Sequence, residues 1–340
     1  MTRERRIAGL APLLGALILA ALILAAPALA QRSAPKPAPL PQPAPNGQAG
    51  QDTIDAAYGA YQRGLYLTAL AEATKRAQLN DPAAMTLLGE IYAQGLGVGR
   101  DDSKASQWYK LAAGRGDRDA LFALAMFSFE GRAGPRNPEE AARLLAEAAK
   151  RGHPAANYNL ALLYLQGQQF PQDFNRAGAL LRVAADAGNP EAQYALATMY
   201  KEGRGVPKDV VQAMALMAKA SIAGNLDAMV EFAIAQFNGQ GTDKNESAAA
   251  RLFLSAARRG SPIAQNRLAR ILMAGRGLPA DATEAIRWHI IAKAAGAGDP
   301  ELDAFAAKQS QSVRDAAGKA AQKWMSSLVA LSPPPPAAKK

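Results

Sequence analysis

The chain has 340 residues, 49% of them hydrophobic, with 39 basic and 29 acidic side chains and a formal net charge of +10. It contains no cysteine and two histidines, His153 and His289, which excludes disulfide scaffolds, thiolate zinc sites and cysteine nucleophiles. The positive charge is spread along the chain, so it favours attraction to acidic surfaces over a dedicated nucleic-acid groove.

Residues 1–30 have the features of an export signal. Basic residues at the start precede a long apolar run, and Ala28 and Ala30 place small side chains at a cleavage site. We expect a signal peptide over 1–30, cleavage after Ala30 and a periplasmic location. Since the apolar run approaches the roughly 20 residues of a membrane span, an uncleaved inner-membrane anchor is the alternative.

Two segments are rich in proline. Proline occupies alternate positions from Pro35 to Pro45, and Pro333–Pro336 are consecutive. Such runs cannot form a helix or a sheet ladder, and they favour an extended, solvated chain. We predict a disordered linker over 31–50 and a disordered tail over 331–340.

Between these segments the sequence repeats with a period of 36 residues. Two series of glycines recur on this interval: Gly95, Gly131, Gly167, Gly203, Gly239 and Gly275, and Gly116, Gly152, Gly188, Gly224, Gly260 and Gly296. Alanine recurs on the same interval in three further series, which begin at Ala84, Ala105 and Ala112. A fixed period of this length indicates stacked structural repeats, and six units cover residues 81–296.

Each unit has the pattern of a helical hairpin. Its first helix, helix A, is preceded by a capping residue and carries apolar residues at helical spacing, such as Ala192, Leu196 and Met199. The loop glycine ends helix A, and an Asp or Asn at the end of the loop suits the start of helix B. The recurring alanines of helix B share one face, which permits close approach of neighbouring helices.

One hairpin cannot bury its apolar face alone. We therefore predict an all-α protein, a right-handed α-solenoid of helix-turn-helix repeats in six 36-residue units plus caps. Residues 51–80 are expected to form an N-terminal capping hairpin. Over 297–330, where Asp299-Pro300 restarts the pattern two residues late, one helix through Phe305 and another through Trp324 are expected to close the stack.

The fourth unit contains Glu191-Ala192-Gln193-Tyr194-Ala195-Leu196 and Gly203-Arg204-Gly205-Val206, and the first contains Gly95-Leu96-Gly97-Val98 and Trp108-Tyr109. These strings resemble the Sel-one-like repeat (SLR) family, which is related to the tetratricopeptide-type helical repeat proteins, and the chain resembles a bacterial exported member of it. The resemblance covers residues 81–296. Units two and five depart from the pattern at Ser128, Gly134-Pro135, Gln236 and Thr242-Asp243, which affects local loop geometry. The resemblance implies adaptor, chaperone-like or regulatory roles through protein binding.

Helix A usually lines the concave side of a hairpin solenoid, and two positions on it are expected to point into the groove. In units two, three and five these positions are apolar, which makes them candidate protein-binding residues: Met126, Phe129, Leu162, Leu165, Ile234 and Phe237. The same positions hold more polar residues in other units, such as Glu90, Thr198 and Arg270. An exposed apolar groove suits a peptide or an amphipathic helix; the alternative is that neighbouring units or the C-terminal helix bury these side chains.

No catalytic, cofactor or metal site is predicted. Gly95–Gly99 is rich in glycine, but it follows a helix, whereas a dinucleotide-binding loop follows a strand. His153 occupies a capping position, and His289 occupies a helix B position that other units fill with Tyr109 or Leu145, for example, which indicates a core residue. The basic residues lack interleaved aromatics, so no nucleic-acid partner is expected.

We therefore expect a non-enzymatic periplasmic scaffold or regulator that captures a segment of another envelope protein in its concave groove. The alternative is a peptidoglycan-associated cell-wall factor, acting by binding or hydrolysis, which the proline-rich spacer and the basic surface favour. The sequence does not identify the partner.

Overall fold

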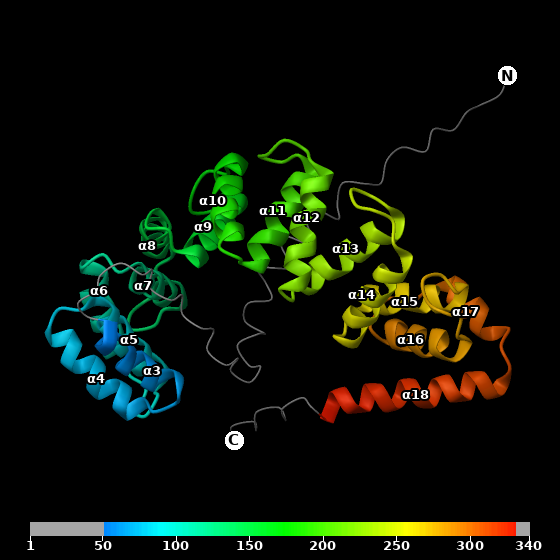
Figure 1. Ribbon diagram of the computed structural model, residues 1–340, viewed down its shortest axis with the longest axis horizontal. Coiled ribbons are helices and arrows are strands. Elements are labelled where there is room, and N and C mark those ends of the chain that lie inside the picture. Colours follow the sequence, from blue (N-terminus) through cyan, green and yellow to red (C-terminus); the bar gives the residue numbers. More distant parts are fainter. Residues whose placement is uncertain (1–50, 331–340) are drawn as a thin grey trace. The chain divides into compact units, whose positions relative to one another are not determined.

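The computed structural model describes residues 51–330, with side chains described over 56–327. This part of the chain forms sixteen α-helices and no strand (Figure 1). They are α3 (Gln51–Gln62), α4 (Tyr66–Gln78), α5 (Pro82–Gln94), α6 (Asp102–Gly114), α7 (Arg118–Glu130), α8 (Pro138–Lys150), α9 (Pro154–Gln166), α10 (Phe174–Asp186), α11 (Pro190–Glu202), α12 (Val210–Ile222), α13 (Leu226–Asn238), α14 (Glu246–Arg258), α15 (Pro262–Ala274), α16 (Ala282–Ala294), α17 (Pro300–Ala307) and α18 (Gln311–Ala330).

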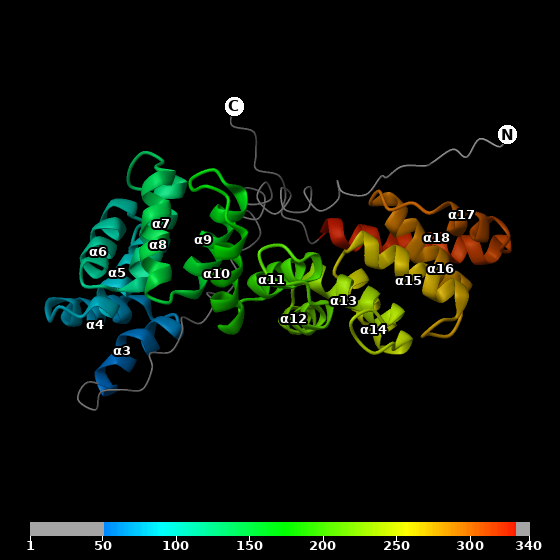
Figure 2. The ribbon, with the colours of Figure 1, turned by 90° about the horizontal axis from the view of Figure 1, so that it is seen from above.

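The six repeats are helical hairpins, as predicted. Helix A is α5, α7, α9, α11, α13 or α15, and helix B is the next helix in the chain. The two helices of a repeat pack together, and helix B also packs against helix A of the following repeat (Figures 1 and 2). The fold is a right-handed α-solenoid of helix-turn-helix repeats, which confirms the predicted class.

The helix starts are fixed by side-chain caps. At every helix A start, the residue predicted as a cap accepts a hydrogen bond from a backbone N–H of the first turn: Asp81, Asp117, His153, Asn189, Asn225 and Ser261. The same holds for every helix B start: Asp101, Asn137, Asp173, Asp209, Asn245 and Asp281. Each such cap is worth about 1 kcal/mol, so the repeat boundaries are encoded locally.

Helix A ends in the same way in all six repeats. The glycine that follows it adopts a left-handed conformation, with φ between 67° and 73°. In five of the six repeats a second loop position is also left-handed, and where it is a glycine it lies against the first residue of the preceding helix B. A Cβ on Gly205 would collide with the backbone of Phe174, and one on Gly277 with that of Glu246. In repeat two this position is Ala133, whose φ is 58°, so the divergent loop keeps the backbone conformation.

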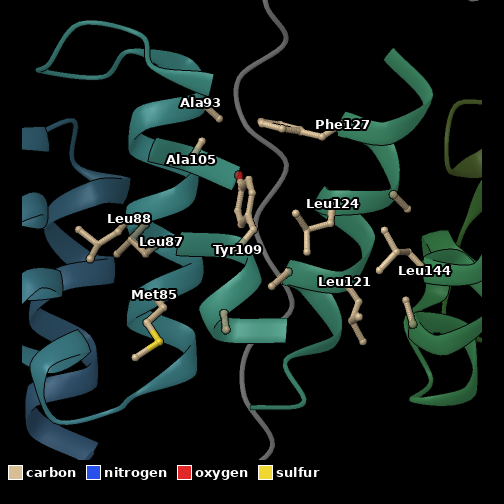
Figure 3. Close-up of a cluster of buried hydrophobic side chains, with 14 of the residues drawn as sticks. Met85, Leu87, Leu88, Ala93, Ala105, Tyr109, Leu121, Leu124, Phe127 and Leu144 are labelled. Atoms are coloured by element: carbon tan, nitrogen blue, oxygen red, sulfur yellow. The ribbon is translucent and has the colours of Figure 1, made fainter. Parts of the chain in front are cut away.

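The core is built from alanines on helix B and larger side chains between them. Ala105 and Ala112 have no exposed surface, and neither do their counterparts in the later repeats. Between these two alanines Tyr109 is 1% exposed and lies between Leu88 of α5 and Leu124 of α7 (Figure 3). Small residues at the helix contacts permit the close packing that stabilises each repeat against its neighbours.

The size of Tyr109 is matched by a glycine on the facing helix. A Cβ at Gly89 would lie 2.5 Å from Cδ1 and Cε1 of Tyr109. In the other repeats the position of Gly89 holds alanine, and that of Tyr109 holds Leu145, Leu181, Met217, Phe253 or His289. In repeat one, the absence of a Cβ at Gly89 therefore leaves room for the ring of Tyr109.

Buried amides link some repeats. Asn157, Gln193 and Gln265 share one position on helix A, and each donates a hydrogen bond of 3.1–3.2 Å to a backbone carbonyl eight residues earlier, in the last turn of the preceding helix B. Each of these carbonyls also accepts the backbone N–H of the glycine three residues later, so the side-chain amide adds a second hydrogen bond that ties helix A to the preceding helix B.

Both ends of the solenoid carry extra helices. α3 and α4 precede the first repeat, and α17 and α18 follow the sixth, where Asp299 caps α17. α18 packs against α16, with the rings of Trp288 and Trp324 in an edge contact 5.7 Å apart. His289 is 3% exposed, and its Nε2 is 2.8 Å from Oδ1 of Asp303. The predicted core position of His289 is confirmed, with a polar contact to α17 added.

The predicted signal peptide over 1–30, the linker over 31–50 and the tail over 331–340 lie outside the residues that the structure describes. Among the helices that it does describe, none combines the length and apolar character needed to cross a membrane.

Candidate protein-binding cleft

The six predicted groove residues lie on α7, α9 and α13. Met126 and Phe129 are half-buried against the core of the first three repeats, and Leu162 is half-buried on α9. Leu165 is buried, with 7% of its surface exposed. Ile234 and Phe237, both on α13, are half-buried and are brought together at one cleft. The structure thus gathers two of the six side chains at a cleft and places the other four in earlier repeats.

This cleft is lined by residues of α13, α14 and α15, by Arg276 and by Glu301 of α17, and it has a volume of about 320 Å³. Half-buried apolar side chains of Ile234, Phe237 and Met273 line it, together with Phe253 and Ile271. Its charged lining consists of Arg267, Arg270, Arg276 and Glu301. The cleft therefore offers apolar contact surface beside guanidinium groups.

The guanidinium of Arg276 is held in place on the aromatic wall. Its Cζ lies 4.6 Å from the ring centroid of Phe237, within the range of a cation–π contact. Its Nε lies 3.3 Å from Oε2 of Glu246, the first residue of α14. Hydrogen bonds from Arg276 and then Lys244 lower the pKa of Glu246 to about 2. The charge of Arg276 is thus already paired with Glu246, and its side chain forms part of the cleft lining.

Arg270 is oriented by a buried carboxylate. Its Nη2 donates to Oδ1 of Asp299 at 3.0 Å, its Nε also donates to Asp299, and the side chain of Asp299 is 5% exposed. Burial alone would raise the pKa of Asp299. Hydrogen bonds from Arg270, Asn266 and the backbone of Glu301 have the larger, opposite effect and lower the pKa of Asp299 to about 2. The third nitrogen, Nη1, lies 3.0 Å from Oε2 of Glu301, which is 61% exposed.

Arg267 differs from both of these arginines. It lies on α15 one turn before Arg270, is exposed, and lines the cleft and an adjoining depression next to Ile263 and Asn266. Within the described part of the chain it makes no hydrogen bond, ion pair or ring contact. Its guanidinium is therefore a cation available at the edge of the cleft.

One repeat earlier, the position of Arg267 is acidic. Glu231 on α13 accepts a hydrogen bond from the hydroxyl of Tyr194 at 3.2 Å and pairs with Lys201 at 2.6 Å. Asp227, one turn before Glu231, has a raised pKa because of its burial and because of the charge of Glu231. Along helix A of the last two repeats, one equivalent position therefore changes from acidic Glu231 to basic Arg267.

Part of the cleft follows from the repeat and part does not. Arg270 and Met273 occupy, one period later, the positions of Ile234 and Phe237, so the 36-residue period alone predicts that they face the same side of helix A. Glu301 lies on α17, where the pattern restarts out of register, and no motif marked it. Arg267 was missed because a single arginine on a helix carries no motif.

The histidines do not line the cleft. Nδ1 of His153 accepts the backbone N–H of Ala156 at 3.0 Å, which confirms the predicted cap, and its ring stacks on Phe122. Burial, followed by the charge of Arg118, lowers the pKa of His153 to about 4. Among the described residues, no group of three or more His, Asp or Glu side chains could hold a metal ion.

Comparison with protein families matches the Sel1 repeat to six consecutive segments that together make up more than half of the chain: 82–117, 118–153, 154–189, 190–225, 226–261 and 262–296. A Sel1 repeat protein from Oxalobacter formigenes is similar in structure, with a TM-score of 0.62 and 29% identity over 71% of this chain and 99% of that one. A protective antigen of uropathogenic Escherichia coli with an SLR fold, c5321, gives a TM-score of 0.55 and 23% identity over 81% of this chain and 69% of that one. No curated protein matches the chain.

Proposed function

Because this chain belongs to the Sel1 repeat family, whose members are helical scaffolds for protein interaction, we propose that it is a non-enzymatic periplasmic scaffold or regulator. In this proposal it captures a segment of another envelope protein on the surface formed by helix A of successive repeats. The periplasmic location rests on the predicted export signal over residues 1–30, and the binding surface rests on the side chains of helix A.

The observation that carries the proposal is the cleft beside α13. Ile234 and Phe237 are half-buried on helix A, and they sit next to Arg267, which has no partner within the described residues. Hot spots of protein interfaces combine aromatic or aliphatic anchors with arginine in this way.

The size of the cleft favours a peptide over a small cofactor. About 320 Å³ is at the lower limit of small-molecule pockets, which span roughly 300–1,000 Å³ and enclose most of their ligand. A cleft of that size accepts one or two side chains, while the rest of a bound segment lies along neighbouring helices. Apolar side chains at Met126 and Leu162 on α7 and α9 would extend such a surface.

A recovery experiment tests the proposal. Partners are purified on the tagged wild type from periplasmic extract, and recovery is compared for Leu162→Asp, Ile234→Asp and the control Arg143→Asp. The side chain of Arg143 on α8 is 68% exposed and pairs with Glu140 of its own helix.

We expect one envelope protein to be recovered with the wild type and with Arg143→Asp, and to be lost with Ile234→Asp or Leu162→Asp while thermal unfolding stays cooperative. Equal recovery with all variants would contradict the proposal. So would sedimentation of the pure protein with sacculi, or release of muropeptides, in the absence of any protein partner; those results would support the cell-wall alternative.

A further inference from the structure

We propose that the cleft beside α13 and α15 binds an acidic peptide segment. A carboxylate of the segment pairs with Arg267 and Arg270, and an adjacent apolar side chain enters the cleft against Ile234, Phe237 and Met273. This inference rests on the proposed protein-binding function and specifies the chemistry of the partner at this site.

Arg267 lacks a counter-charge among the described residues. It is exposed, lines the cleft, and has no hydrogen bond or ion pair in the part of the chain that the structure describes. Residues three apart on a helix are neighbours, so Arg267 and Arg270 present two guanidinium groups along one face of α15. A carboxylate is the group that such donors bind with good geometry.

Arg270 is already oriented by Asp299, whereas its Nη1 is held only by the exposed Glu301. The buried carboxylate of Asp299 fixes Nε and Nη2, whereas Nη1 contacts Glu301, whose side chain is 61% exposed. Exposed ion pairs contribute little free energy, so a carboxylate of the partner can replace Glu301 at small cost. Fixing the guanidinium beforehand reduces the entropy that binding loses.

The apolar half of the cleft is free to accept a side chain of the partner. Arg276 is already paired with Glu246 and lies on the ring of Phe237, so it shapes the wall and does not compete for the partner's carboxylate. Met273 and Ile234 complete a surface that accepts an aliphatic or aromatic side chain. An acidic residue next to an apolar one therefore matches the arrangement of the site.

The charge pattern along helix A provides selectivity. Glu231 occupies the position of Arg267 one repeat earlier, and Asp227 lies next to it on α13. Glu231 is paired with Lys201, so this position of α13 offers an acidic segment no unpaired cation, whereas α15 offers Arg267. Complementary charge thus sets where the segment lies as well as how fast it associates.

The test uses the full exported chain and a displayed library of random linear peptides. Enriched peptides are synthesised and their dissociation constants measured by fluorescence anisotropy. The variants are Arg267→Glu, Met273→Ser and Leu162→Asp, and the control is Arg251→Glu, which makes the same charge change at an exposed residue of α14 away from the cleft lining.

We expect the enriched peptides to carry Asp or Glu next to an aliphatic or aromatic residue. Arg267→Glu should weaken their binding by at least about tenfold and Met273→Ser by a smaller factor, whereas Arg251→Glu should change it less than about twofold. Replacing the acidic residue of the peptide with lysine should restore binding to Arg267→Glu.

Peptides that bind Arg267→Glu as tightly as the wild type would overturn this inference. If they were nevertheless lost with Leu162→Asp, the proposed function would stand and the acidic cleft alone would be rejected. Failure to enrich any peptide on the folded wild type would reject both.

Discussion

The contact between Gly89 and Tyr109 gives a prediction whose sign depends on the background in which it is measured. Replacing glycine with alanine inside a helix normally stabilises it by about 0.5–1 kcal/mol. Here the new Cβ would lie 2.5 Å from two ring carbons of Tyr109, where carbon atoms prefer about 3.5–4.0 Å. The ring is 1% exposed, and its hydroxyl donates to Oε2 of Glu90 at 2.9 Å, so it has no free direction in which to move.

Overpacking of a core costs about 1–3 kcal/mol. After subtracting the gain in helix propensity, we expect Gly89→Ala to lower the free energy of unfolding by about 1–2 kcal/mol. Tyr109→Leu alone should cost about 2 kcal/mol because it leaves a cavity. In the Tyr109→Leu background, Gly89→Ala recreates the pairing of Ala125 with Leu145 in repeat two, and it should then stabilise by about 0.5–1 kcal/mol.

The assay is urea denaturation of the wild type, both single variants and the double variant, followed by far-UV circular dichroism. If the effect of Gly89→Ala changes sign between the two backgrounds, the coupling free energy between residues 89 and 109 is about 2 kcal/mol. A double-mutant cycle resolves a coupling of this size for residues in contact. If Gly89→Ala stabilised the wild type, or had the same effect in both backgrounds, the steric explanation for the glycine would be refuted.

Three further predictions concern the caps and the C-terminal end. The pKa of His153 is about 4 in the folded protein and 6.5 ordinarily, so the unfolded state binds a proton first as the pH falls. The free energy of unfolding should therefore decrease by up to about 3 kcal/mol between pH 7 and pH 4. His153→Asn keeps the cap and should remove this pH dependence of the free energy of unfolding. Asp299, with its pKa of about 2, should contribute about 2 kcal/mol to the free energy of unfolding above pH 4, and this contribution should be lost as the pH falls toward 2. Asp299→Asn should lower the free energy of urea unfolding at pH 7 by that amount and abolish this loss of stability in acid. Trp324→Ala should cost about 3 kcal/mol and speed hydrogen exchange in α18, as read by mass spectrometry; unchanged exchange would show that the contact with Trp288 does not hold that helix.

The repeats were predictable because their information is local. Each hairpin contains its own signals: a capping residue such as Asp81, a terminating glycine such as Gly95 and the buried alanines of helix B. The 36-residue period then gives the number of hairpins. For this reason the structure confirms the predicted N-cap residues of the helices, the glycine turns and the fold class. The same logic covers α17, because Asp299-Pro300 is a helix start by the same rules.

The cleft was only partly predictable because it depends on pairing between residues distant in sequence. The pattern predicted that Ile234 and Phe237 point into the groove, but it could not show that Arg270 is held by Asp299 while Arg267 has no partner among the described residues. That difference arises from the shifted start of α17, which lies outside the period. Likewise Gly89 is explained by a ring twenty positions later in the chain.

The central claim, that helix A of the later repeats binds a protein segment, is tested most directly by photo-crosslinking in living cells. A photoreactive amino acid replaces Phe237 on α13, and in a control strain it replaces the exposed Arg143 on α8. The account predicts that one envelope protein is trapped from position 237 and not from position 143, and that Arg267→Glu reduces the adduct. No adduct from position 237, or the same proteins trapped from both positions, would contradict it.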